Sequence, residues 1–203
     1  MSLSLVMPIN NKHTQIIKLA IDIRDLRIAK TGARTYLTEL ITHWSKQSAI
    51  EIVLIDTKHE VYTGKQKLFK LIEHILYQYW KQWLLPRKAK QHHCTHLLCT
   101  DFFLPYFKQG LKTITVLHDA FFWESPEHYN AMWLQLFHTL AVPAAKKADA
   151  IIVPSQYVKE KLLTLENFDA SKLQVIYEAA KSFDTIDSLN TNLKQKQSIN
   201  IAA

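Results

Sequence analysis

The sequence predicts an α/β fold in which helices cover both faces of a doubly wound, mainly parallel sheet of about six strands. Short runs of branched apolar residues alternate along the chain with longer segments whose apolar residues recur at helical spacing. Parallel strands that neighbour each other need helical crossovers of this kind. With 203 residues and 48% hydrophobic content, the chain can also bury one sizeable core.

Residues 16–23 form the first predicted strand, because branched apolar side chains fill a segment that would be buried on both faces. Asp22 is expected near its carboxyl end. Apolar and aromatic residues then keep helical spacing over residues 31–44, with Thr31 at the N-cap. Residues 51–56 are the second strand and complete a βαβ unit.

A long helix is predicted over residues 65–90, whose apolar side chains share one face while nearly all of the charge lies opposite. The more common arrangement packs the apolar face on the sheet and leaves a basic face in solvent. The alternative is a peripheral membrane contact, because Tyr79, Trp80, Trp83 and flanking lysines suit the headgroup region of anionic lipid. Nucleic acid is not expected as a partner, since no groove-reading motif is present.

The third strand is predicted over residues 95–100, next to a cluster of potential zinc ligands: His92, His93, Cys94 and His96. No second ligand pair stands at zinc-finger spacing, so these residues are expected to be polar decoration of the sheet edge, without metal. Cys94 and Cys99 would lie about 17 Å apart in an extended strand and cannot pair, which fits a reducing compartment.

Residues 112–119 are the fourth strand, which ends in His118 and Asp119 and leads into an aromatic loop. Ser155 ends the fifth strand and is expected to cap the helix after it. Pro143 should kink or break the helix that is predicted around it, over residues 130–148. The remaining predicted elements are a helix over residues 130–148, a strand over 149–155, a helix over 156–165 and a strand over 172–179.

Right-handed crossovers bring four groups to the same edge of this sheet: the turn at Gly32, Asp101, His118 with Asp119, and Ser155. Ligands of open α/β sheets bind at that edge, outside the carboxyl ends of the strands. Gly32 begins a helix, where free backbone amides can meet an anion, although a glycine there can also simply permit a tight turn. The convergence of the four groups predicts a ligand site.

Residues 1–15 are expected to be a loose N-terminal leader, because their short apolar patch follows no basic residue and does not fit a signal peptide. No window approaches the roughly 20 apolar residues that span a bilayer. Residues 64–93 carry seven basic residues and one acidic residue, so most of the net charge of +7 is local. We expect a cytoplasmic protein, and peripheral contact of the helix over residues 65–90 with the inner face of the membrane is the alternative.

Four motifs carry a resemblance to a known family: TGARTY at residues 31–36, LHD at 117–119 followed by Pro126 and Glu127, ADAIIVPS at 148–155, and KLQVIY at 172–177. In this combination and order they resemble the N-terminal domain of retaining, nucleotide-sugar-dependent glycosyltransferases of family four. The resemblance covers residues 16–180. It implies a Rossmann-like domain that is one half of a GT-B architecture.

The resemblance also implies roles for individual residues. His118 would lie beside the transferred sugar, and Asp119 and the aromatic loop would shape the acceptor site. The backbone at Gly32 and Ala33, with Arg34, would approach the donor phosphates or the acceptor from across the cleft. Asp101 and Ser155 are the other candidate substrate-binding residues at this edge.

By the same resemblance, the donor is a nucleotide sugar that acts as co-substrate, the transferred unit is a hexose, and neither a metal nor another cofactor is expected. The acceptor would be a sugar, a glycan or a lipid-linked molecule. Residues 181–203 read as a polar linker towards a C-terminal donor-binding domain, so this chain alone is expected to be inactive. The alternative is a noncatalytic α/β module that binds a ligand or a partner.

Overall fold

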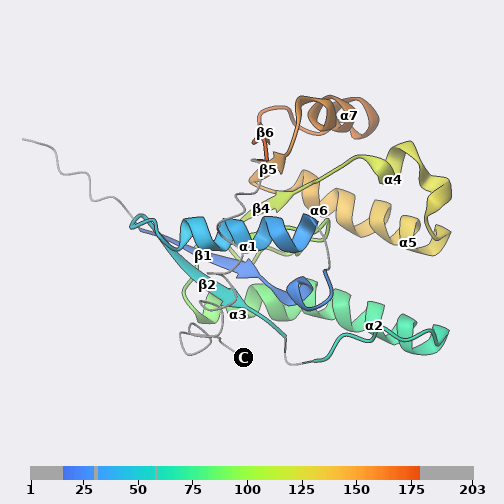
Figure 1. Ribbon diagram of the computed structural model, residues 1–203, viewed down its shortest axis with the longest axis horizontal. Coiled ribbons are helices and arrows are strands. Elements are labelled where there is room, and N and C mark those ends of the chain that lie inside the picture. The colour runs from blue at the N-terminus through green and yellow to red at the C-terminus, as the bar shows by residue number, and fades with distance from the viewer. Residues whose placement is uncertain (1–15, 30–31, 58, 179–203) are drawn as a thin grey trace, which may run out of the picture.

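The computed structural model describes residues 16–29, 32–57 and 59–178, and it contains one six-stranded sheet (Figure 1). All paired strands are parallel, in the order β2-β1-β3-β4-β5-β6. The strands are β1 (Ile17–Asp22), β2 (Ile50–Ile55), β3 (His96–Cys99), β4 (Lys112–Val116), β5 (Ala150–Val153) and β6 (Leu173–Val175). The predicted parallel sheet is confirmed, and the proposed leader and linker lie outside the described residues.

The helices are α1 (Gly32–Trp44), α2 (Lys67–Tyr79), α3 (Leu85–Gln91), α4 (Phe121–Glu124), α5 (Ala131–Leu136), α6 (Val142–Lys146) and α7 (Gln156–Glu166). The loops after β1 and α4 also hold short 3-10 turns, η1 (Arg24–Arg27) and η3 (Pro126–His128). None of the described helices is both long enough and apolar enough to cross a membrane. The predicted N-cap Thr31 lies outside the described residues.

Helices cover both faces of the sheet, as β1 illustrates. Leu19 and Ile21 join a core cluster with Leu37 of α1, whereas Ala20 between them belongs to a second cluster. That second cluster contains residues of α3, α6 and α7. Successive side chains of a strand point to opposite faces, so the two clusters are the two faces of a doubly wound sheet. Figure 1 shows α1 alone in front of β1.

Two long helices contain a π-helical turn shortly before a proline. One runs from α2 through η2 (Trp80–Leu84) into α3, and the other runs from α5 through η4 (Phe137–Ala141) into α6. Pro86 and Pro143 are each the second residue after the π turn. Proline has no N–H to donate and clashes with the carbonyl four residues earlier, so the wider turn lets the helix continue. The irregularity predicted at Pro143 is this π turn.

The orientation of α2 differs from the more common arrangement, in which its apolar face would pack on the sheet. None of its residues is buried, and its large apolar side chains face solvent. Its inward-facing side instead carries Glu73 and Tyr77, followed one turn later by Lys81 of η2. Lys81 is 1% exposed, so its assignment to a solvated basic face is wrong.

The two cysteines lie in the core. Cys94 and Cys99 are both buried and unpaired, as predicted, and burial raises the pKa of the Cys94 thiol to about 11. Cys94 is therefore not polar decoration of the sheet edge, because it packs under β3 against apolar neighbours. Among the described residues, the cluster of histidines around it gathers no set of ligand atoms close enough to hold a metal ion.

Candidate active site

His118 lies two residues beyond the end of β4 and is held by three other segments. Its Nε2 is 3.1 Å from the backbone carbonyl oxygen of Thr100, which follows β3, and its Nδ1 is 3.4 Å from Oε1 of Glu178, which follows β6. Its ring meets that of Tyr36 from α1 edge-on, with centroids 4.9 Å apart. A carbonyl oxygen only accepts, so Nε2 must carry a hydrogen. In the neutral imidazole Nδ1 is then an acceptor, and it faces the carboxylate of Glu178.

Tyr36 and Glu178 are parts of the His118 environment that sequence reasoning did not assign. Burial and the nearby charge of Glu178 together raise the pKa of the Tyr36 hydroxyl. Tyr36 belongs to the TGARTY motif, but nothing in its spacing indicates a contact with a residue 82 positions later. Glu178 follows the last strand, and only the parallel topology brings it beside the end of β4.

Asp119 and Ser155 stabilise the starts of helices. Oδ1 of Asp119 accepts a hydrogen bond from the backbone N–H of Phe121, at 3.0 Å, as α4 begins. Oγ of Ser155 accepts from the N–H of Val158, at 3.2 Å, so the predicted N-cap of α7 is confirmed. Both side chains thus already have backbone partners at the sheet edge where the sequence predicts them.

Gly32, Ala33 and Arg34 form the first turn of α1, beside an open, basic depression. The depression has a volume of about 610 Å³ and is lined by Arg27, Ile28, Ala29, Arg34 and Thr63. Arg27 donates to Asp56 at 2.9 Å and to two backbone carbonyls. The exposed Arg34 makes no ion pair with any described residue. A Cβ added to Gly32 would meet no described atom within 4 Å.

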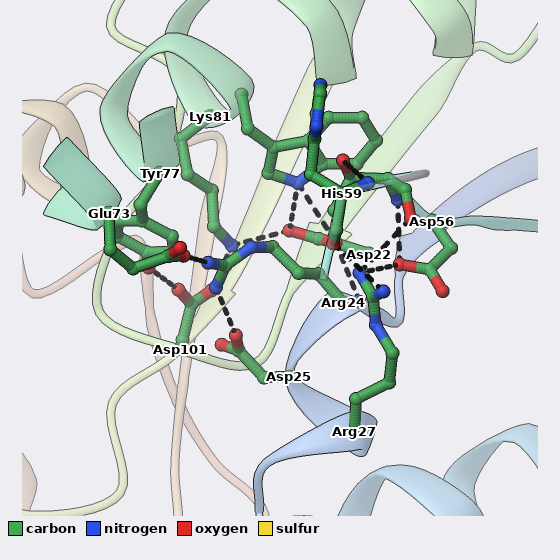
Figure 2. A network of polar contacts seen from close by, with 12 residues as sticks. Asp22, Arg24, Asp25, Arg27, Asp56, His59, Glu73, Tyr77, Lys81 and Asp101 are labelled. Carbon is green, nitrogen blue, oxygen red and sulfur yellow. Dashed lines mark hydrogen bonds and ion pairs between the residues drawn. The ribbon is translucent and has the colours of Figure 1, made fainter. Parts of the chain in front are cut away.

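Asp101, the remaining predicted site residue, belongs to a buried polar network at the ends of β1 and β3 (Figure 2). Lys81 Nζ lies 2.5 Å from Oδ1 of Asp101 and 2.6 Å from Oδ2 of Asp22. The hydroxyl of Tyr77 donates to the other oxygen of Asp101. Burial alone would lower the pKa of Lys81, but Asp101 and Asp22 outweigh it and raise that pKa well above its usual value.

Arg24 extends the network towards α2. The guanidinium group bonds to Glu73 and, at 3.1 Å, to Asp25, and it lies 4.7 Å from the ring centroid of Tyr77. Figure 2 shows these groups converging from η1 and α2 on the residues at the strand ends. The sequence predicts a solvated basic face on this helix. Part of that face instead consists of Glu73, Tyr77 and the buried Lys81, which all bind other residues of the same domain.

Lys81 occupies the position that a metal ion would take in this network. Asp22, Cys99 and Asp101 offer ligand atoms that all lie within 4.8 Å of one another, the one such group among the described residues. The ammonium group bonds to both carboxylates, and burial raises the pKa of Cys99 well above its usual value. A protonated thiol is a poor metal ligand. The carboxylates therefore bind the ammonium group of Lys81, and the arrangement does not fit a metal ion.

The network is also linked to His118 through the chain itself. Thr100, whose carbonyl oxygen bonds to the imidazole, is followed directly by Asp101, whose side chain is bound by Lys81 and Tyr77. The backbone carbonyl of Asp101 also accepts from Oγ1 of Thr115, at 3.4 Å. The loop that orients His118 is thus fixed by α2 and β4. Glu73, Tyr77 and Lys81 are four residues apart, so they share one face of a helix. This spacing is the signal in the sequence that could have revealed the polar side of the helix.

A second cavity, an apolar groove, lies between α2 and the segment around α5. It has a volume of about 1150 Å³. One wall is formed by Leu71, Ile75 and Gln78 of α2, and the other includes Phe122 and Trp133. Phe122 belongs to α4, which begins two residues after Asp119. One wall of the groove is therefore formed by a residue only three positions after Asp119 in the sequence.

Asp25 gives the network a measurable pH dependence. Burial and the charge of Asp101 raise its pKa from 3.8 to about 6, so between these values the folded protein binds more protons than the unfolded chain. The contribution of Asp25 to the free energy of unfolding is therefore greatest at low pH, and it is lost as the pH rises through about 6. Asp25→Asn should remove this loss. The melting temperature of Asp25→Asn minus that of the unmutated protein should therefore be about 3 °C larger at pH 7.5 than at pH 5. This corresponds to a difference of about 1 kcal/mol in the free energy of unfolding.

The matched control is Asp169→Asn, because hydrogen bonds from Ser171 lower the pKa of Asp169. That variant should show no such gain between the two pH values. Equal pH profiles for Asp25→Asn and the unmutated protein in thermal unfolding would show that Asp25 is not perturbed in this way.

Comparison with known proteins gives two kinds of match. The family model described as Glycosyltransferase Family 4 matches residues 30–180. Ten chains of solved structures also match, among them a glycosyltransferase from Rickettsia africae ESF-5 at 11% identity and a TM-score of 0.46. That match covers 88% of this chain and 49% of the other, so the chain spans about half the length of that structure. None of the curated proteins compared with the chain matches it significantly.

Proposed function

Because the chain belongs to glycosyltransferase family 4, we propose that it is the acceptor-binding half of a retaining enzyme that transfers a sugar from a nucleotide sugar. The acceptor is a glycan, a lipid-linked molecule or another hydroxyl compound, and the transferred unit is a hexose. A second Rossmann-like domain binds the donor, and the cleft between the two domains encloses the reaction. The chain alone is therefore inactive, and no resident metal or other cofactor takes part.

The observation that carries this proposal is the convergence of His118 and the first turn of α1 at one edge of the sheet. The Nδ1 atom of His118 and the carboxylate of Glu178 are two neighbouring hydrogen-bond acceptors, which suit the O–H groups of a sugar as donors. Transfer passes through a centre with oxocarbenium character, which nearby hydrogen-bond acceptors and negative charge stabilise. We assign His118 as the residue beside the transferred sugar, with Asp119 and the aromatic loop on the acceptor side.

The basic depression beside α1 supports the assignment of a phosphate-binding role to Gly32, Ala33 and Arg34. Backbone amides at a helix N-terminus and guanidinium groups both bind phosphate oxygens. Gly32 does not have a positive φ, and no described atom crowds its Cα. A glycine there is explained by the close approach of a ligand to the backbone.

Replacing Arg34 by glutamine should weaken binding of inorganic pyrophosphate to the chain about 3- to 10-fold, since one charge-assisted hydrogen bond is lost. The measurement is a titration followed by NMR at low salt. Arg87→Gln is the matched control, because Arg87 is exposed on α3, outside the depression. Equal affinity for all three proteins would contradict the phosphate site and favour a noncatalytic module.

Gly32→Ala is the second arm of this experiment. Alanine is a better helix former than glycine, so thermal stability should stay the same or rise slightly. Pyrophosphate binding should nevertheless weaken, because the methyl group blocks the approach to the backbone amides. A variant that is less stable but binds normally would instead assign the glycine a purely conformational role.

We place the action of the enzyme in the cytoplasm, at the inner face of the membrane. The support for this location is the exposed apolar side of α2 together with the groove beside it. An apolar groove of this volume suits the hydrocarbon part of a lipid-linked acceptor, whose hydroxyl end would then reach the candidate site.

A further inference from the structure

The outward side of α2 and its π turn is an unusually apolar surface. We define this outer face of α2 by six side chains that are each between 42% and 66% exposed: Leu68, Ile72, Ile75, Leu76, Tyr79 and Trp83. Large exposed apolar patches on soluble domains mark sites of interaction. From Leu68 to Trp83 the helix rises about 22 Å, so the surface is long and narrow.

The buried polar network fixes this orientation of the helix. Glu73 is bound by Arg24, Tyr77 by Asp101, and Lys81 by Asp101 and Asp22, so the polar stripe of the helix is anchored to the domain. Turning the apolar side chains onto the domain would break these contacts and leave Asp22 and Asp101 without the cation that neutralises them. The exposure of the outer face is therefore a stable feature of the fold.

The exposed charged residues on the helical segment that carries the outer face are all basic. Glu73 is the only acidic residue between residues 64 and 93, and its carboxylate points inward to Arg24. Lys65, Lys67 and Lys70 are exposed. The segment thus combines exposed apolar side chains with exposed positive charge and has no exposed acid.

Aromatic side chains continue the surface at its C-terminal end. The ring of Trp83 lies 6.1 Å from that of Phe107, which is itself 60% exposed, and Tyr79 stands one turn earlier. Tryptophan and tyrosine are enriched at the boundary between headgroups and acyl chains, because one end of the ring system is apolar and the other can hydrogen-bond.

We propose that the outer face of α2, continued by Phe107, docks onto an anionic lipid bilayer with the helix parallel to the membrane plane. The inference deepens the proposed location at the inner membrane face by naming the surface and the lipid charge. Apolar side chains would enter the acyl boundary while the lysines contact anionic headgroups. A second copy of the chain fits less well, because a symmetric contact would bring two sets of lysines together.

The test is flotation of the 203-residue chain with vesicles, without any sugar donor, so its result does not depend on transfer activity. The chain should float with vesicles of phosphatidylcholine and phosphatidylglycerol at low salt, and should float far less with phosphatidylcholine alone or at high salt. Leu68→Glu should reduce binding at least about tenfold, because it removes a leucine that enters the acyl boundary on docking and adds an acid. Leu165→Glu, the same change at an exposed position of α7, should bind like the unmutated chain.

Four results would overturn the proposal: no flotation with anionic vesicles at low salt, equal flotation with neutral vesicles, equal binding by Leu68→Glu and the unmutated chain, or equal losses in the two leucine variants. Self-association that Leu68→Glu abolishes, in the absence of vesicle binding, would assign the outer face to a protein interface instead. Circular dichroism checks that both variants are folded, since both leucines are exposed.

Discussion

Replacing Lys81 by methionine is expected to destabilise the protein by about 3–5 kcal/mol, which lowers the melting temperature by about 10 °C. Methionine fills a similar volume but leaves the buried carboxylate of Asp22 and the half-buried carboxylate of Asp101 without their cation. The stability should be measured by urea unfolding at pH 7. The hydrogen bonds of Asp22 to Trp80 and of Asp101 to Tyr77 remain, but they do not neutralise two negative charges.

Lys70→Met provides the control for this change, because Lys70 is exposed on the same helical segment. It should alter stability by less than about 0.5 kcal/mol. Adding Asp101→Asn to the Lys81→Met protein should recover part of the loss, since it removes one of the two uncompensated charges. A Lys81→Met protein as stable as the Lys70→Met protein would show that the buried network does not stabilise the fold.

Replacing His118 by alanine should reduce sugar transfer about 100-fold or more in a protein that joins this domain to its donor-binding domain. The imidazole would no longer stand beside Glu178 at the point where we expect the transferred sugar. The imidazole is partly exposed, so its loss should change stability much less than it changes the rate. Initial rates with saturating donor measure the effect, and thermal unfolding checks the fold.

His128→Ala is the matched histidine variant, because His128 is exposed in η3 and, among the described residues, pairs only with its neighbour Glu127. Its transfer rate should equal that of the unmutated protein. Glu178→Gln separates contact from positioning. If Glu178 shares a sugar hydroxyl with His118, the amide variant should lose rate while it remains folded. Unchanged transfer by His118→Ala would defeat the assignment of His118.

The inner strands β3 and β5 could be predicted from the sequence because they are largely buried on both faces and therefore form continuous apolar runs. All six observed strands overlap their predicted ranges, but most are shorter. β4 ends at Val116, since the residues after it turn towards α4 and bring His118 out of the ladder. Such ends depend on the loops that follow, which periodicity does not describe.

The orientation of α2 could not be predicted in the same way. Helical periodicity states which side chains share a face, but the partners supplied by other segments decide which face packs. Here the partners are Asp22, Arg24 and Asp101, which come from two strand ends and a short turn. A lysine such as Lys81 is usually exposed, and only these acidic residues make its burial favourable.

The candidate site divides in the same manner. The positions of His118, Asp119 and Ser155 at strand ends follow from the order of the elements along the chain, whereas their contacts do not. Glu178 stands 60 residues after His118 in the sequence, and the two meet because parallel strands end at one edge. Local rules account for the caps formed by Asp119 and Ser155.

The most direct test of the central claim compares sugar transfer by the purified 203-residue chain with transfer by the same chain joined to a donor-binding domain. Donor consumption and the anomeric configuration of the product are followed by NMR. We expect transfer with retained configuration from the joined protein and little or none from the chain alone. Robust turnover by the 203-residue chain alone would show that it is a complete catalyst and would contradict its assignment as one half of the active site.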